Sequence, residues 1–366
     1  MSNDLLYQIA LTKIPHIGDV HAKALINFFG EAKAIFDAPL KKLESLEGIG
    51  TIRANSIKKF ENFTSCKSEI DFIEKHKITP LFITNKDYPK RLLNCYDSPV
   101  LLYYRGTADL NADKIVSIVG TRKHSDYGKL ICEKLVEELN DRNILIVSGL
   151  AFGIDTIAHK TSLKNNMQTV AVLAHGLDNI YPAQNKALAA QMTSFGGLLT
   201  DFPKETNPDK QNFPKRNRIV AGICDALIVV ESGIKGGSLI TAELANSYNK
   251  DVFAFPGKTT DSKSEGCNYL IKNNKAILIT SANDLLLNMN WKTSSKAKAG
   301  TQKQLFIELS AHEKKIYDIL QQNENTQIDT LFAKAAISSS SMAAALLSLE
   351  MQGIITSLPG KIYKLC

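Results

Sequence analysis

The stretch Ile115-Val116-Ser117-Ile118-Val119-Gly120-Thr121-Arg122 joins a run of apolar and β-branched residues to a glycine turn. A run of this kind is typical of a strand that is covered on both faces of its sheet. Between residues 114 and about 289 the pattern recurs, and each run is followed by helical periodicity. The alternation predicts an α/β domain with a doubly wound, mostly parallel sheet. The expected strands are 115–119, 144–147, 169–173, 198–200, 226–230, 252–255 and 276–279.

Segments of different character flank this domain. Residues 1–66 hold two apolar-glycine turns, 14–18 and 46–50, each between helical periodicities, and predict a small helical domain. Such a turn either presents a helix N-terminus to a phosphate or is a glycine cap between packed helices. The α/β domain is expected over 67–290, entered through a bridging region with a strand-like run at 100–104.

The C-terminal part divides again. Residues 291–304 contain four lysines and no acid, and predict a linker. Residues 305–366 combine three helical periodicities with a final hairpin. This order predicts a winged helix.

The composition is that of an ordinary globular protein. Of 366 residues, 44% are hydrophobic and 22% are charged, which excludes a wholly disordered or fibrous chain. No stretch approaches the roughly 20 apolar residues of a membrane span, and the N-terminus lacks a signal-like run, so a cytoplasmic protein without a membrane partner is expected. The net charge of +7 is compatible with a polyanionic partner. The six cysteines are scattered singly, so neither a disulfide framework nor a metal site is expected.

Small and polar residues follow the expected strands. Gly120-Thr121-Arg122 follows the first strand, Ser148-Gly149 the second, and Gly236-Gly237-Ser238 a later one. Because glycine lets a backbone approach an anion, and a following helix offers free N–H groups, several such loops along one edge predict a phosphate-binding rim. The first loop lacks the G-x-G-x-x-G pattern and no Walker A motif occurs, so no NAD or ATP cofactor is expected.

The basic segment Lys210-Gln211-Asn212-Phe213-Pro214-Lys215-Arg216-Asn217-Arg218 is expected between a strand and a short helix near the same rim. Guanidinium and ammonium groups clamp phosphates, and Phe213 offers a stacking face to an unpaired base, as in single-strand binders. The alternative is a solvated charge run with Phe213 as a core plug. Arg122, expected across the sheet edge, favours the nucleic-acid interpretation.

Catalytic arrangements are weaker. Asp155 and His159 are one helical turn apart, a spacing common on ordinary helix faces. Ser148 lacks the G-x-S-x-G elbow, and His175 has no obvious partner. No catalytic residue is therefore assigned.

In combination these motifs resemble the DprA (Smf) family of DNA-processing proteins over most of the chain. The signature Phe213-Pro214-Lys215-Arg216-Asn217-Arg218-Ile219 is joined by the stretches 88–89, 92, 97–99, 105–106, 117–122, 127–128, 148–151, 153–155, 158–159, 176–178, 181–182, 185, 230–231, 237–242 and 256–257. There are two departures: Ala174-His175 stands where the family usually has a Gly-led pair, and Thr200-Asp201 replaces the common Ser-Glu. Of these, His175 is a residue that could alter the local loop.

The resemblance implies a recombination mediator rather than an enzyme. It implies an extended Rossmann-like domain that binds single-stranded DNA, loading of RecA onto incoming strands in natural transformation, and a homodimer. It also implies a helix-hairpin-helix, SAM-like domain at the N-terminus and a winged helix at the C-terminus. Carried over position by position, and with Lys210 added from its spacing, the DNA-binding residues are Gly120, Thr121, Arg122, Ser148, Gly149, Lys210, Phe213, Lys215, Arg216, Asn217, Arg218, Gly236, Gly237 and Ser238.

Two other functions compete with this interpretation. Residues 236–243 also look like the P-G-G-x-G-T-x-x-E loop of Rossmann-like phosphoribohydrolases, which cleave nucleoside monophosphates, although Lys235 and Leu239 replace the leading proline and the third glycine. A transcription factor built on the winged helix is the other. Residues 339–346 of its third helix offer no Arg or Lys to a major groove, which argues against it.

Overall fold

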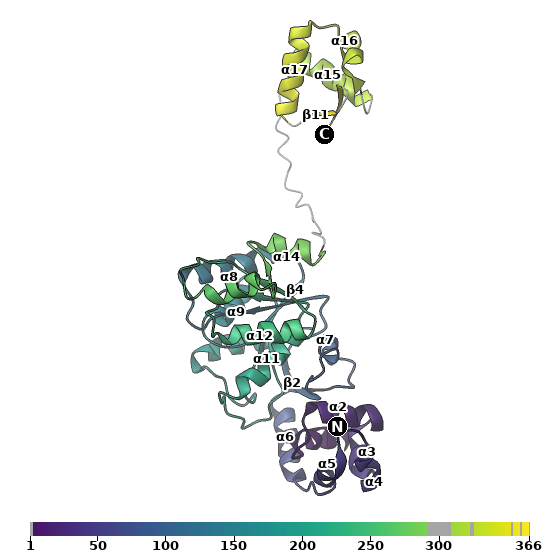
Figure 1. The fold of residues 1–366 in the computed structure, drawn as a ribbon, viewed down its shortest axis with the longest axis vertical. Helices are drawn as coiled ribbons and strands as arrows, with labels where there is room; N and C mark the ends of the chain where they lie inside the picture. The colour runs from purple at the N-terminus through teal and green to yellow at the C-terminus, as the bar shows by residue number, and fades with distance from the viewer. Residues whose placement is uncertain (1–2, 292–308, 323–325, 353, 359–360, 366) are drawn as a thin grey trace. The chain divides into compact units, whose positions relative to one another are not determined.

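A computed structural model describes residues 3–291, 309–322, 326–352, 354–358 and 361–365 (Figure 1). The chain divides into two compact units, Met1–Ser294 and Ser295–Cys366. Of the predicted linker, only Trp291 is among the described residues. No single helix among these residues is long and apolar enough to cross a bilayer. The helices α16 (Ile328–Ala335) and α17 (Ser339–Met351) meet that test only when joined, and they are bent by 116° at their junction.

A nine-stranded sheet forms the centre of the first unit, in the order β1-β2-β6-β5-β4-β3-β7-β8-β9. From β6 to β9 in this order all neighbours pair in parallel, whereas β1 and β2 pair antiparallel at one side. The seven expected strands are confirmed to within two residues at each end, and the strand-like run at 100–104 is part of β2. The strands are β1 (Thr79–Phe82), β2 (Leu101–Gly106), β3 (Lys114–Val119), β4 (Ile144–Ser148), β5 (Thr169–Val172), β6 (Gly196–Thr200), β7 (Ala226–Val229), β8 (Asp251–Ala254) and β9 (Ile277–Leu278).

Helices cover both faces of the sheet because successive side chains of each strand point to opposite faces. Ile115 and Val119 of β3 pack in the core under α11 and α12, whereas Val116 and Ile118 pack in the core under α8 and α9. The first face carries α7 (Lys90–Leu93), α11 (Asn212–Gly222), α12 (Gly237–Ser247) and α13 (Glu265–Lys272). The other carries α8 (Asp126–Glu138), α9 (Ile154–Lys164), the short η1 (Ala183–Asn185), α10 (Lys186–Ser194) and α14 (Ala282–Asn288).

The N-terminal helices share a hydrophobic core with the sheet. Ile9 and Leu25 belong to the same buried cluster as Tyr103 of β2 and Leu198 of β6. Arg53 donates hydrogen bonds to the carbonyls of His16 and Gly48, and so joins the two glycine turns. The domain boundary at residue 66 stays a prediction. The helices are α1 (Asn3–Lys13), α2 (Asp19–Phe29), α3 (Ala32–Asp37), α4 (Leu40–Glu44), α5 (Gly50–Lys58) and α6 (Phe63–Lys75).

The second unit confirms the predicted winged helix. Three helices, α15 (Ala311–Gln322), α16 (Ile328–Ala335) and α17 (Ser339–Met351), pack around buried Ile316, Leu331 and Leu346. A small sheet in the order β10-β12-β11 completes it, formed by β10 (Thr326–Gln327), β11 (Ile355–Leu358) and β12 (Ile362–Leu365).

The basic segment differs from the prediction in its secondary structure. It was expected to precede a short helix, but α11 begins at Asn212, so Phe213 to Arg218 already lie in its first turns. Pro214 is tolerated there because proline has no backbone N–H, and the N–H groups in the first turn of a helix have no intrahelical acceptor in any case. Successive side chains of this segment therefore point in different directions around a helix.

Candidate nucleic-acid interface

A pocket of about 490 Å³ lies at the carboxyl edge of the sheet, where β3, β4 and β7 end. We call it the strand-edge pocket. The loops after these strands and the first turns of α11 and α12 form its walls. Of the residues predicted for DNA binding, it brings together Gly120, Thr121, Arg122, Gly149, Lys210, Phe213, Arg216, Asn217, Gly236, Gly237 and Ser238.

Arg216 lies deepest among the basic residues of the strand-edge pocket, with only 6% of its surface exposed. Its Nη1 donates to the carbonyl of Val172 at the end of β5, and its Nε donates to Asn217 Oδ1 at 3.2 Å. No carboxylate of the described residues lies within 4.0 Å of its guanidinium nitrogens. Burial lowers the pKa of Arg216 from its ordinary value, and the more distant Asp155 opposes that shift. Within the part of the chain that the structure describes, the guanidinium is thus a buried cation without an ion-pair partner.

Gly149 makes room for this arrangement. A Cβ atom at Gly149 would collide with Asp155 Oδ2 and would lie 2.5 Å from Arg216 Nη1. Asp155, in the first turn of α9, accepts a hydrogen bond from the Ala151 N–H at 3.2 Å. Burial raises the pKa of Asp155, and Arg216 opposes that shift. Glycine at 149 therefore leaves space between an acid and a base that face one another across the pocket wall.

Arg122 lies at the mouth of the pocket, exposed to solvent. Its guanidinium carbon is 5.0 Å from the centre of the Phe213 ring, within the range of a cation–π contact. The loop that carries Arg122 is fixed on both sides: the Thr121 N–H donates to the Glu231 carbonyl at 2.7 Å, and the Thr121 carbonyl accepts from the Ile154 N–H at 3.2 Å. A side chain exposed on a rigid loop suits a ligand that arrives from solvent.

Buried polar groups hold the surrounding loops. The Glu231 carboxylate accepts hydrogen bonds from the backbone and hydroxyl of Ser125, the N-cap of α8. His159 on α9 lies with Nε2 at 2.6 Å from the Gly149 carbonyl and Nδ1 at 2.7 Å from Thr169 Oγ1. Burial lowers the pKa of His159 to about 4, so its ring is neutral at neutral pH.

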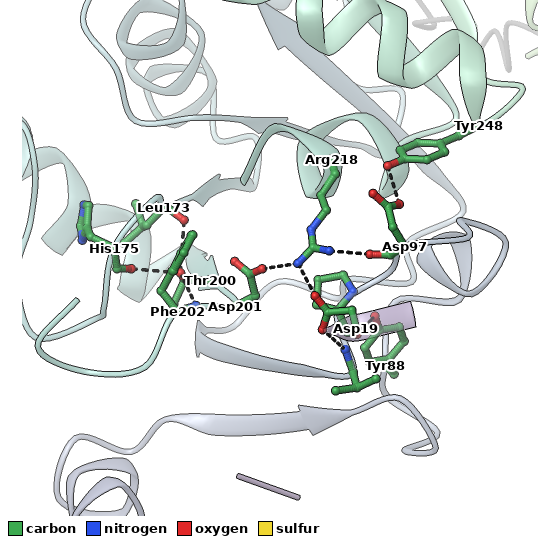
Figure 2. Close-up of polar contacts among 12 residues, drawn as sticks. Asp19, Tyr88, Asp97, Leu173, His175, Thr200, Asp201, Phe202, Arg218 and Tyr248 are labelled. Carbon is green, nitrogen blue, oxygen red and sulfur yellow. Dashed lines mark hydrogen bonds and ion pairs between the residues drawn. The ribbon is translucent and has the colours of Figure 1, made fainter. Parts of the chain in front are cut away.

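Arg218, which was also predicted to bind DNA, does not line the strand-edge pocket. Its guanidinium lies between two carboxylates, with Nη2 at 2.7 Å from both Asp19 Oδ2 and Asp201 Oδ2, as Figure 2 shows. Its Nη1 donates to the Asp97 carbonyl at 2.6 Å. Burial acts to lower its pKa, but the two carboxylates more than offset this and raise it. Arg218 therefore joins α11 to the first residue of α2 instead of presenting a free cation.

Ser148 and Lys215 also lie outside the pocket lining. The Ser148 hydroxyl is fully buried and donates to the Ile118 carbonyl at 2.6 Å, so it links β4 to β3. Lys215 is exposed on α11.

The Asp19 carboxylate that pairs with Arg218 also accepts the Val100 N–H at 3.2 Å. The first glycine turn thus directs its helix N-terminus at the α/β domain.

The residues weighed for catalysis have structural partners. Glu243, the acid of the phosphoribohydrolase-like loop, pairs with Lys275 at 3.2 Å, and both are exposed. His175 is buried, and its Nε2 accepts the Tyr181 N–H at 3.2 Å. Among the residues that the structure describes, no three His, Cys, Asp or Glu side chains gather as metal ligands.

Some residues at the site were not predicted. Asp155 and Thr241 line the strand-edge pocket, and Phe152 and Tyr181 line a small cavity beside it. Asp155, Thr241 and Tyr181 lie in stretches that carried the family resemblance, and Phe152 does not. Nothing in the spacing of Phe152 and Tyr181 shows that two loops bring them together.

Comparisons with known proteins agree with this architecture. Residues 79–290 match the family model of DNA recombination-mediator protein A, residues 302–361 that of the DprA winged helix domain, and residues 9–68 that of the helix-hairpin-helix motif. The chain is 32% identical to Protein Smf of Synechocystis, over 99% of each chain.

Two solved structures are similar. DNA processing protein A of Streptococcus pneumoniae matches with a TM-score of 0.67 and 32% identity, covering 78% of this chain and 98% of that one. DNA processing protein A of Helicobacter pylori, described for its single-stranded-DNA binding mode, matches with a TM-score of 0.54 and 30% identity, covering 59% of this chain and 96% of that one.

Proposed function

The chain belongs to the DprA/Smf family of DNA-processing, recombination-related proteins, and from that premise we propose that it binds single-stranded DNA in the strand-edge pocket as a non-catalytic recombination mediator. By family membership the proposal extends to RecA loading in natural transformation and to a homodimer.

The buried guanidinium of Arg216 carries the proposal. A buried charge without a partner is unfavourable, and a charge-assisted hydrogen bond to an anion removes much of that cost. A phosphate in the strand-edge pocket supplies such an anion. Arg122 and Lys210 line the same pocket, so a phosphodiester chain meets more than one cation. The backbone N–H groups of Gly237 and Ser238 begin α12 and add donors of favourable helix-dipole sign.

A pocket that recognises phosphates through cations and helix ends reads no base sequence. The proposal therefore predicts binding that depends on strand length and salt rather than on sequence. It also predicts preference for single strands over duplexes, because a pocket enclosed by loops admits a flexible chain more readily than a stiff double helix.

The test is competition binding. A labelled oligo-dT bound to the wild-type protein is challenged with unlabelled single-stranded and duplex DNA of mixed sequence. We expect the single strand to displace the label at much lower concentration than the duplex. Equal competition by duplex, or no binding of oligo-dT by the folded protein, contradicts the proposal.

RecA loading and dimerisation are tested separately. RecA ATPase activity is measured on single-stranded DNA that is already coated with single-strand-binding protein, and we expect this chain to shorten the lag. Sedimentation equilibrium of the full chain is expected to give twice the monomer mass of 40.3 kDa. An unchanged lag refutes the loading step alone, and a monomer refutes the dimer alone.

A further inference from the structure

An aromatic group lies beside the strand-edge pocket. Phe152 from the loop after β4, Tyr181 from the loop after β5, and Phe213 of α11 line a small cavity of about 30 Å³ together with Arg122 and Arg216. Arg122, Phe213 and Arg216 also line the strand-edge pocket, so the two cavities are adjacent. The aromatic rings thus begin where the cationic pocket ends.

The three rings differ in how much surface they offer to a ligand. The Arg122 guanidinium lies over the Phe213 ring. The centroids of the Phe213 and Tyr181 rings are 6.3 Å apart, and the two ring planes form an angle of 61°. Phe213 is therefore partly covered and serves to hold Arg122 in place. Phe152 and Tyr181 are 43% and 46% exposed. Two exposed aromatic rings next to the Arg122 and Arg216 guanidinium groups form a surface suited to unpaired nucleobases, which stack on aromatic faces whatever their sequence.

We propose that Phe152 and Tyr181 form a base platform, a subsite on which unpaired bases stack while the phosphates of the same strand lie in the strand-edge pocket. The inference rests on the proposed function and adds the recognition of bases to that of phosphates. A cavity of about 30 Å³ has room for little more than a water molecule, so the bases lie on the rings and not inside the cavity.

The platform is held rigid by hydrogen bonds between its two loops. Buried Asn185, which follows Tyr181 in the chain, donates from Nδ2 to the Leu150 carbonyl at 3.0 Å and to Thr156 Oγ1 at 2.9 Å. The Thr156 hydroxyl in turn donates to the Ala151 carbonyl at 2.7 Å. Leu150 and Ala151 directly precede Phe152. The loops that carry the two rings are therefore fixed relative to each other before any ligand binds.

His175 positions Tyr181. Its Nδ1–H donates to the Gly176 carbonyl at 2.9 Å, and its Nε2 accepts the Tyr181 N–H at 3.2 Å. The Thr200 hydroxyl donates a hydrogen bond to the His175 carbonyl at 3.0 Å. This pattern requires a neutral ring, and burial lowers the pKa of His175 in agreement with it. The histidine that departs from the usual family pair thus sets the backbone under the platform tyrosine.

The experiment compares two ligands of equal charge, oligo-dT of about 15 nucleotides and an abasic phosphodiester of the same length. The proteins are the wild type, the double variant Phe152→Ala/Tyr181→Ala, and the single variant Tyr181→Phe. Tyr96→Ala is the matched control, because Tyr96 is also exposed, at 64%, but packs against Tyr248 and does not line this cavity. We expect the double variant to bind oligo-dT roughly 10- to 100-fold more weakly, because it loses the stacking of bases on both rings. Its affinity for the abasic strand and its salt slope stay at wild-type values, and Tyr181→Phe and Tyr96→Ala bind as wild type does.

A fluorescence readout separates stacking from a loop defect. Trp291 is the one tryptophan of the sequence, so Tyr181→Trp in a Trp291→Phe background places the sole indole on the platform. We expect oligo-dT to quench its emission and the abasic strand to leave it unchanged. Wild-type affinity of the double variant for oligo-dT, or equal weakening for both ligands, refutes the platform while leaving DNA binding in the pocket intact. Failure of the wild type to bind either ligand refutes the proposed function as well.

Discussion

Arg216 and Arg218 lie two residues apart on α11, and their guanidinium groups occupy opposite kinds of environment. Arg216 lines the strand-edge pocket, with a backbone carbonyl and an amide oxygen as its acceptors. Arg218 is held between Asp19 and Asp201. The first guanidinium has capacity for an external anion, and the second has used its charge within the fold. One helix therefore carries both the cation that we propose to bind DNA and the connection to the N-terminal helices.

Replacement of Arg218 by alanine is expected to destabilise the fold. The change leaves Asp19 and Asp201 facing each other in a largely buried place, which costs about 3 kcal/mol in unfolding free energy. Urea unfolding of Arg218→Ala measures the loss. The triple variant with Asp19→Asn and Asp201→Asn should recover part of it, because the uncompensated charges are then gone. A loss below about 1 kcal/mol, the range of exposed ion pairs, contradicts the structural role.

Gly149→Ala is expected to disturb the pocket from within. The added Cβ meets the side chains of Asp155 and Arg216, so one of them must move. We expect a cost of about 1 to 3 kcal/mol in stability, as for other overpacked sites, together with weaker DNA binding. Gly237→Ala is the matched control for stability, since a Cβ there has open space. Equal thermal stability of the two variants refutes the tight packing at Gly149.

The buried histidine of α9 predicts a dependence of stability on pH. Burial lowers the pKa of His159 from 6.5 to about 4, so between these values the unfolded chain binds the proton and the folded chain does not. The contribution is fully present above pH 6.5 and is lost as the pH falls toward 4, by about 3 kcal/mol in total.

Other groups titrate in the same range, so the measurement is a difference. Unfolding free energies of wild type and His159→Gln are compared at several pH values, since glutamine keeps polar groups near Gly149 and Thr169 but does not titrate. We expect the gap between the two proteins to change across this window, with the wild type losing more stability toward low pH. Parallel curves contradict the low pKa of His159.

The central sheet could be predicted because its strands are local signals. Each is a short apolar run buried on both faces, and the run predicts the strand without knowledge of its neighbours. β1 was not predicted, because it is only four residues long, lies at the edge of the sheet and contains Pro80. The glycine loops were placed correctly at one edge, since the carboxyl ends of parallel strands must meet there.

The roles of individual residues were harder to predict. Sequence alone grouped Arg216 with Arg218, although residues two apart on a helix do not share a face. The two-residue spacing separates Arg216 from Arg218 only if both lie in a helix, and the structure shows that they do because α11 begins at Asn212. The acids that form ion pairs with Arg218 are Asp19 and Asp201, and no local sequence pattern indicates that they lie close together. The same holds for Phe152 and Tyr181, which line one small cavity from two loops that Asn185 connects through hydrogen bonds.

Phosphate binding by Arg216 is tested by the salt dependence of oligo-dT binding, measured by fluorescence anisotropy for wild type and Arg216→Ala. Arg105→Ala serves as an exposed-arginine control. If the Arg216 guanidinium binds a phosphate, the variant loses affinity and its slope of log affinity against log salt falls by about 0.7, while Arg105→Ala keeps both. A folded Arg216→Ala protein with wild-type affinity and slope would show that the strand-edge pocket is not where DNA binds.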